Sequence, residues 1–122
     1  MNITLESLGF TAGQTVFVET TPDWYGAMIE EAGLEVTPDL PADHAHLFFA
    51  SKDELHEFLE EYYLKDVRQS VWFSWPKVES GIKTDLNEQV VLDAITKIGF
   101  AGGDAVDIDD VWAGLRFTRK VR

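Results

Sequence analysis

The sequence has 122 residues, of which 45% are hydrophobic, and it carries 22 acidic against 10 basic residues, a formal net charge of -12, and no cysteine. Without cysteine the chain forms no disulfide, iron-sulfur or thiolate zinc site, and no apolar run approaches the ~18 residues that span a bilayer. The acidic balance argues against nucleic-acid and membrane partners, because phosphate groups bind through clustered Lys and Arg. We therefore expect one soluble, cytoplasmic domain over residues 1–122 that buries its own core.

The first third of the chain predicts a strand, a helix and a second strand. Residues 16–18 are apolar and rich in β-branched side chains, which is typical of a strand buried on both faces. A helix is expected to begin at Thr21-Pro22, where threonine can cap and proline suits the first helical position, and to end at Gly33. A short strand over residues 34–36 is expected to follow.

The middle third repeats this alternation. Residues 47–50 and 71–73 are short apolar runs that predict two further buried strands. Between them, Ser51 and Glu54 have the spacing of a capping box, which predicts the start of a helix. The inner face of that helix is expected to carry Leu55, Phe58, Leu59 and Tyr62.

The last third predicts a third helix and an antiparallel hairpin. The helix is expected to begin near Asp85, with Glu88 at capping-box spacing, and to end at Gly99. Its expected buried face consists of Val90, Val91, Ala94, Ile95 and Ile98. Residues 106–108 and 115–117 alternate apolar with polar side chains and lie too close in sequence for a crossover, so they should pair as a hairpin. Together these elements predict an α/β fold in three layers, with about three helices covering a mostly parallel sheet.

Several short motifs make the chain similar to a known family. The more specific run is Trp75-Pro76-Lys77 with Ser80-Gly81 and Thr84-Asp85-Leu86, and a second consists of Asp109, Trp112, Gly114 and Leu115. Earlier landmarks are Leu8-Gly9-Phe10, Gly13, Pro22 and Leu47-Phe48. From Leu8 to Phe117 the chain thereby resembles a bacterial family known as domain of unknown function 3052.

The resemblance implies a fold but no activity. It implies a small, truncated Rossmann-like domain with methyltransferase-like topology, in which a six-stranded sheet has the order 2-1-3-4-6-5. The last two strands form a hairpin, and the final strand is inserted in the sheet. The sequence departs from the family pattern at Val78, where relatives often have a second lysine, and at Thr20-Thr21, where Asn-Ala is common. The first departure weakens any anion site built on paired lysines.

The place where such a fold binds cofactors does not have the expected residues. Ligands of open α/β sheets bind outside the carboxyl ends of the strands, where the strand order reverses, here between residues 16–18 and 47–50. A nucleotide site needs glycines directly after the first strand, so that the backbone can approach phosphate. Residues 18–24 are instead bulky, and Glu19 and Asp23 would repel a pyrophosphate. We therefore predict no dinucleotide, S-adenosylmethionine or other cofactor.

The loop after residues 71–73 carries the main candidates for a binding site. It combines two ammonium groups with hydroxyls and the free N–H groups of a helix start, which together could hold a small anion. The candidate ligand-binding residues are Lys77, Ser80, Gly81, Lys83 and Thr84, with Asp109 and Trp112 near them. The alternative is an ordinary connection in which Gly81 makes a turn, Lys77 pairs with Glu79 or Asp109, and Asp85 caps the helix.

Metal and catalytic sites are not predicted. Asp43, His44 and His46 lack a third ligand of the right kind nearby, and a hydrogen-bonded histidine at a strand entrance is the favoured interpretation. The acidic group Asp104, Asp107, Asp109 and Asp110 lacks the pattern of a calcium loop. The serines and histidines show no recognisable catalytic arrangement, so catalytic residues stay unidentified.

Aromatic and charged side chains leave further alternatives open. Trp24, Trp75 and Trp112 either line one cleft with Lys77 or cover edges of the core, and we favour the second interpretation. The acidic face of the helix after Ser51 is either simply solvated or attracts a basic partner. The charge is unevenly divided, with -16 over residues 1–115 and +4 over the last seven residues, so the tail could pair with the acidic surface, another subunit or an acidic partner.

Three hypotheses on function follow. The preferred one is a non-catalytic binding or interaction module on a degenerate Rossmann-like scaffold. The alternative is a small-anion or metabolite-binding protein, or an enzyme, that uses the loop from Lys77 to Asp85. The third is assembly through an exposed terminal strand or through residues 116–122. A small anion and a protein are both open as partners.

Overall fold

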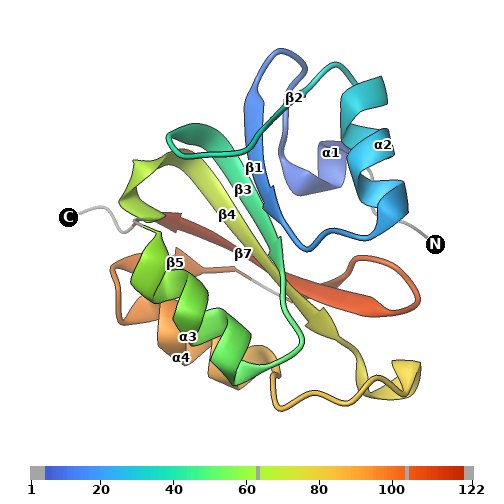
Figure 1. Cartoon of the computed structure of the whole chain (residues 1–122), viewed down its shortest axis with the longest axis vertical. Helices are drawn as coiled ribbons and strands as arrows, with labels where there is room; N and C mark the ends of the chain where they lie inside the picture. The colour runs from blue at the N-terminus through green and yellow to red at the C-terminus, as the bar shows by residue number, and fades with distance from the viewer. Residues whose placement is uncertain (1–4, 63, 104, 120–122) are drawn as a thin grey trace.

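The computed structural model describes residues 5–62, 64–103 and 105–119, which form one mixed sheet between two layers of helices (Figure 1). The strands are β1 (Thr15–Glu19), β2 (Glu35–Thr37), β3 (Ala42–Phe48), β4 (Val67–Pro76), β5 (Phe100–Gly102), β6 (Val106–Asp107) and β7 (Trp112–Arg119). The helices are α1 (Leu5–Leu8), α2 (Asp23–Glu31), α3 (Lys52–Glu61) and α4 (Glu88–Thr96), with 3-10 turns η1 (Leu64–Asp66) and η2 (Val78–Ser80).

The sheet has the predicted α/β topology. Its order is β2-β1-β3-β4-β7-β5, with parallel pairs from β2 to β4 and β7 inserted antiparallel to β4. The predicted order is therefore confirmed, but the described part of the sheet has seven strands rather than six, because the outer edge strand is split. Both β5 and β6 pair with β7, through Phe100 with Arg119 and Val106 with Gly114.

The helix after Ser51 begins as the capping box predicts. The Ser51 hydroxyl accepts from the Glu54 amide at 3.2 Å, and the Glu54 carboxylate accepts from the Ala50 amide at 2.8 Å. These bonds satisfy N–H groups that the first helical turn cannot pair internally. The local sequence therefore fixes the start of α3.

The other two predicted helix starts need correction. In α4 the cap is Asn87, which accepts from the Val90 amide at 2.9 Å, rather than Asp85. In α2 the N-cap is Pro22 and no side chain caps the helix, so Thr21 does not cap it as predicted. The predicted end of α2 is right, since Gly33 adopts a φ of 87°, a left-handed conformation that suits glycine.

Two apolar clusters hold the layers together. The helices α1 and α2 pack on one face of the sheet, where Tyr25, Phe48 and Trp72 are buried, and α3 and α4 cover the other face, where Leu55, Phe73 and Ile95 are buried (Figure 1). Ile98 does not join this core as predicted, because it lies beyond the end of α4 and is 38% exposed.

The tryptophans divide between these clusters. Trp75 is buried on the α3 and α4 face, whereas Trp24 and Trp112 pack on the α1 and α2 face. They therefore do not line one cleft, and the interpretation that they cover the core is supported. Among the described residues, no helix is long and apolar enough to cross a membrane.

Candidate functional site

The carboxyl ends of β1 and β3 meet where the strand order reverses, which is the position of ligands in sheets of this kind. The turn from β1 to α2 is formed by side chains larger than glycine. Thr20 adopts a φ of 51°, a left-handed conformation that is uncommon for residues other than glycine, and its hydroxyl donates to the Phe48 carbonyl at the end of β3. This side chain links the two strand ends at the point where a cofactor's phosphate or carboxylate would approach the backbone.

A small acidic cleft lies beside this turn. It has a volume of about 180 Å³ and lies between the ends of β1 and β3 and the helix α3. Its lining residues are Glu19, Thr20, Phe49, Glu54, Glu57, Phe58, Glu61 and Tyr62. Burial and the nearby Glu61 carboxylate raise the pKa of Glu19. Four carboxylates in so small a space create a negative potential that disfavours an anionic ligand.

The predicted residues of the Lys77 loop do not form one cluster. Lys77 lies at the end of β4, where its amide donates to the Val111 carbonyl at 2.7 Å and its ammonium group is 3.6 Å from the carboxylate of Asp107. The expected pairing with Glu79 or Asp109 is therefore wrong. Asp109 instead accepts from the amides of Val111 and Trp112 and forms the turn before β7.

Trp112 packs against an aromatic ring of the core, and the η2 turn is closed by a hydrogen bond within the loop. The Trp112 ring lies edge-on to Phe48, with ring centroids 5.2 Å apart. The Ser80 hydroxyl donates to the Lys77 carbonyl at 2.7 Å, and Gly81 ends the turn with a φ of 78°. The expectation that Gly81 makes a turn is confirmed.

Lys83 and Thr84 lie at a different place, beside the amino end of α3. With Ala50, Ser51 and Asp85 they line an open hollow of about 330 Å³. The Asp85 carboxylate accepts from the Lys52 amide, the first of α3, at 2.8 Å. A carboxylate of the chain thus already occupies the position where an external anion would meet this helix.

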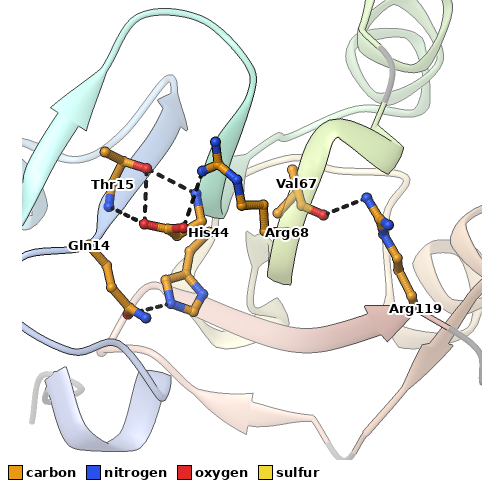
Figure 2. Close-up of polar contacts among 7 residues, drawn as sticks. Gln14, Thr15, His44, Val67, Arg68 and Arg119 are labelled. Atoms are coloured by element: carbon orange, nitrogen blue, oxygen red, sulfur yellow. Dashed lines mark hydrogen bonds and ion pairs between the residues drawn. The ribbon is translucent and has the colours of Figure 1, made fainter.

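A buried polar network lies on the face of the sheet that α1 and α2 cover, and it consists of His44, Ser70 and Gln14. His44 is fully buried, and one of its ring nitrogens lies 2.7 Å from Ser70 Oγ. The other lies 2.7 Å from Gln14 Oε1, and this contact is drawn in Figure 2. Burial lowers the pKa of His44 to about 4. The negative charge of Asp43 opposes this shift, and the positive charge of Arg116 adds to it.

Separate polar contacts link the strands beside His44. Thr15 and Asp43 exchange bonds between β1 and β3, the Asp43 carboxylate accepts from Arg68 at 3.2 Å, and Arg119 donates to the Val67 carbonyl (Figure 2). The bond from the Thr15 amide, followed by the interaction with Arg68, lowers the pKa of Asp43. Arg119, one of the four cations of the basic tail, thus forms a hydrogen bond within the domain.

His46 lies two residues along the same strand and is equally buried. Its nitrogens lie 2.7 Å from the Tyr25 hydroxyl and 2.7 Å from Ser74 Oγ, and its ring stacks on Phe48. Burial holds the pKa of His46 well below its usual value and that of Tyr25 well above it.

The sequence analysis favoured a hydrogen-bonded histidine at this strand, which is confirmed, but it missed that the partners include two serines. The available signal was the presence of Ser70 and Ser74 in the largely apolar second part of β4. Parallel pairing places Ser70 opposite His44 and Ser74 opposite Phe48, from where its hydroxyl reaches His46. All four ring nitrogens have partners and both serines are buried, so these groups are enclosed in the core. In the described ranges, no group of three or more His, Cys, Asp or Glu side chains could hold a metal ion. Asp104, from the acidic group considered for calcium, lies outside the described residues.

The comparisons with known proteins support the fold alone. No family model matches the chain, and no curated protein matches its sequence, so the resemblance to domain of unknown function 3052 stays a prediction. Several solved structures have a similar fold. One is magnesium protoporphyrin IX methyltransferase from Synechocystis with bound S-adenosylmethionine, at a TM-score of 0.58 and 7% identity, covering 94% of this chain and 73% of the enzyme.

Two further solved structures have a fold similar to that of this chain. An S-adenosylmethionine-dependent methyltransferase from Aquifex aeolicus aligns with a TM-score of 0.55 and 15% identity, over 95% of this chain and 87% of that one. The protein DhpI, in complex with S-adenosylhomocysteine, aligns with a TM-score of 0.53 and 12% identity, over 96% and 71% of the two chains. The chain therefore has a Rossmann-like fold of the methyltransferase type.

Proposed function

We propose that this protein is a non-catalytic binding module on a methyltransferase-like scaffold, in which the usual cofactor position binds no S-adenosylmethionine. The observation that supports the proposal is the turn from β1 to α2. Thr20 spans the gap to the Phe48 carbonyl, and no glycine allows a ligand to approach the backbone there. In this proposal, the Thr20 side chain takes the space that a cofactor would need at the strand ends.

The charges beside the turn disfavour cofactors that carry phosphate. The cleft beside the turn contains Glu19, Glu54, Glu57 and Glu61. These carboxylates would repel the pyrophosphate of a dinucleotide. S-adenosylmethionine carries two cations, the ammonium and the sulfonium, against one carboxylate, so for this compound the proposal depends on the turn and not on the charges. The pKa of Glu19 is raised mainly by burial, and the Glu61 carboxylate raises it further.

The burial of both histidines of β3 is the third supporting point. The described histidines with perturbed pKa values, His44 and His46, are enclosed by the sheet and its helices. A general base must lie within hydrogen-bond reach of the proton that it removes from a substrate. Neither histidine meets that requirement, and their partners are satisfied within the core.

A ligand titration tests the proposal. The protein is heated with increasing S-adenosylmethionine or S-adenosylhomocysteine, while a methyltransferase that binds them is run in parallel. A ligand at one hundred times its dissociation constant would stabilise the fold by about 2.7 kcal/mol, which raises the Tm of a domain of this size by several degrees. We expect no shift with either compound. A saturable increase in Tm, or transfer of a methyl group to any acceptor, would show that the proposal is wrong.

A second candidate is small-anion binding in the hollow beside α3. It is favoured by Lys83, which forms no ion pair within the described residues and lines the hollow with Thr84. If phosphate binds there, Lys83→Gln should abolish the amide shifts that phosphate causes in α3, whereas Lys77→Gln should leave them unchanged. Equal effects of both variants, or no shifts at all, would reject this candidate.

A further inference from the structure

A groove runs between α3 and α4 on the outer side of their layer. It consists of two adjoining hollows of about 480 and 410 Å³, which share Leu59, Lys97 and Ile98. Sites for small molecules commonly have volumes of ~300–1,000 Å³ and mainly apolar walls. The groove therefore has the size of a ligand site, and it is separate from the turn between β1 and α2.

The floor of the groove is apolar and incompletely covered. At the end near the amino edge of the sheet, the larger hollow is lined by Tyr62, Leu64 and Phe100. Ile98 is 38% exposed although its sequence pattern predicts burial, and Leu59 is only partly buried. An apolar ligand in this groove would remove these side chains from water.

The charges along the groove favour an anionic ligand. Lys97 lies where the two hollows meet, and Lys52 and His56 line the smaller hollow. Neither lysine forms an ion pair in the described part of the chain, although the sequence contains 22 acidic residues. The one acid in the lining is Asp93, which accepts a bond from Gln89 at 2.8 Å.

We propose that the groove between α3 and α4 binds a single-chain anionic amphiphile of the fatty-acid class. The hydrocarbon chain would lie over Leu59 and Ile98 toward Phe100, and the carboxylate would pair with Lys97. This inference goes beyond the proposed function, because the acidic cleft and the larger hollow share only Tyr62, at the end of α3. Binding in the groove and binding of S-adenosylmethionine are therefore tested separately.

The test uses dodecanoate, below the concentration at which it forms micelles, with the full chain stripped of lipid. Dodecanol and dodecyltrimethylammonium are the matched probes, since they keep the hydrocarbon chain and change the head group. We expect dodecanoate to bind saturably at one site and to shift the NMR signals of α3 and α4, about tenfold more tightly than the cationic probe. Equal affinity for all three probes, signals that move elsewhere, or the absence of binding would overturn the proposal.

Three variants locate the site. Lys97→Gln should weaken dodecanoate binding about fivefold, the range of a single exposed ion pair, and leave dodecanol unaffected. Ile98→Lys should weaken dodecanol binding, and its exposed position lets the fold tolerate the change. Lys77→Gln removes a lysine that lies outside the groove and pairs with Asp107, so it is the control and should leave both affinities unchanged. The proposal is wrong if Lys97→Gln and Lys77→Gln behave alike, provided that melting curves show both to be folded.

Discussion

Acidification should destabilise this protein through its buried histidines. The folded state holds His44 neutral down to about pH 4, whereas the histidine of an unfolded chain takes up a proton near pH 6.5. Between these values the unfolded state binds more protons than the folded state, so a fall in pH favours unfolding. His46, whose pKa burial also lowers, acts in the same direction.

The size of the effect follows from the two pKa values of His44. The difference between 6.5 and about 4 corresponds to about 3 kcal/mol once the pH is below both values. Between pH 7 and pH 5, His44 alone should remove about 2 kcal/mol from the free energy of unfolding. Glu19 opposes this change, because a carboxyl group whose pKa is raised by folding stabilises the fold as the pH falls.

The assay is urea unfolding at a series of pH values for the wild type and for His44→Gln. The variant should be less stable at pH 7, because it disturbs the bonds to Ser70 and Gln14, but its stability should depend less steeply on pH between 6.5 and 4. His56→Gln, on the exposed side of α3, removes a histidine outside the network and is the control. Parallel pH curves for the wild type and His44→Gln, or a His44 ring that titrates near pH 6.5 by NMR, would refute the reasoning.

Three further predictions concern individual contacts. Gly114→Ala should lower the free energy of unfolding by about 1–3 kcal/mol, because the new Cβ would lie 2.8 Å from Ile108 Cδ1 in a packed core; urea unfolding measures this. Asp85→Ala should cost about 1 kcal/mol in the same assay, because it removes the carboxylate that caps the first amide of α3. Glu61→Gln should lower the pKa of Glu19, measured by carboxyl NMR, because it removes a repelling charge.

The two predictions on stability each have a control in the same chain. Gly26 lies within α2 with open space where a Cβ would lie, so Gly26→Ala should stabilise the protein where Gly114→Ala does not. Glu79→Gln changes an exposed carboxylate within η2 and should cost less than Asp85→Ala. Equal stability changes within either pair, or a Glu19 pKa that does not respond to Glu61→Gln, would contradict the assigned contacts.

The strands and helices were predictable because their signals are local. The runs at 16–18 and 71–73 consist of apolar side chains typical of a buried strand, and they lie within β1 and β4. The run at 47–50 identified the third strand but not its bounds, because β3 begins at Ala42 and ends at Phe48. The Ser51 and Glu54 pair needs only the first turn of its own helix to form. Neither signal depends on which element lies next to it.

The start of α4 and the candidate site depended on tertiary contacts. Asp85 and Asn87 are both good capping residues within three positions of one another, and the choice is settled by α3, whose first amide binds Asp85. Likewise Lys77 and Lys83 are close in sequence, but the η2 turn directs Lys77 to Asp107 and Lys83 to the amino end of α3. Spacing in an irregular loop does not determine the direction of its side chains.

The position of α3 connects the proposals about ligands. One side of the helix contributes Glu54, Glu57 and Glu61 to the acidic cleft, and another contributes Leu59 and His56 to the groove with α4. An anionic head group is repelled on the first side and has unpaired lysines available on the second, within the part of the chain that the structure describes. If the chain binds a small anionic molecule, the charge distribution therefore favours the groove over the acidic cleft beside the turn from β1 to α2. This preference can be measured directly. Dodecanoate and S-adenosylmethionine should not compete for binding, and Lys97→Gln should weaken the binding of dodecanoate alone.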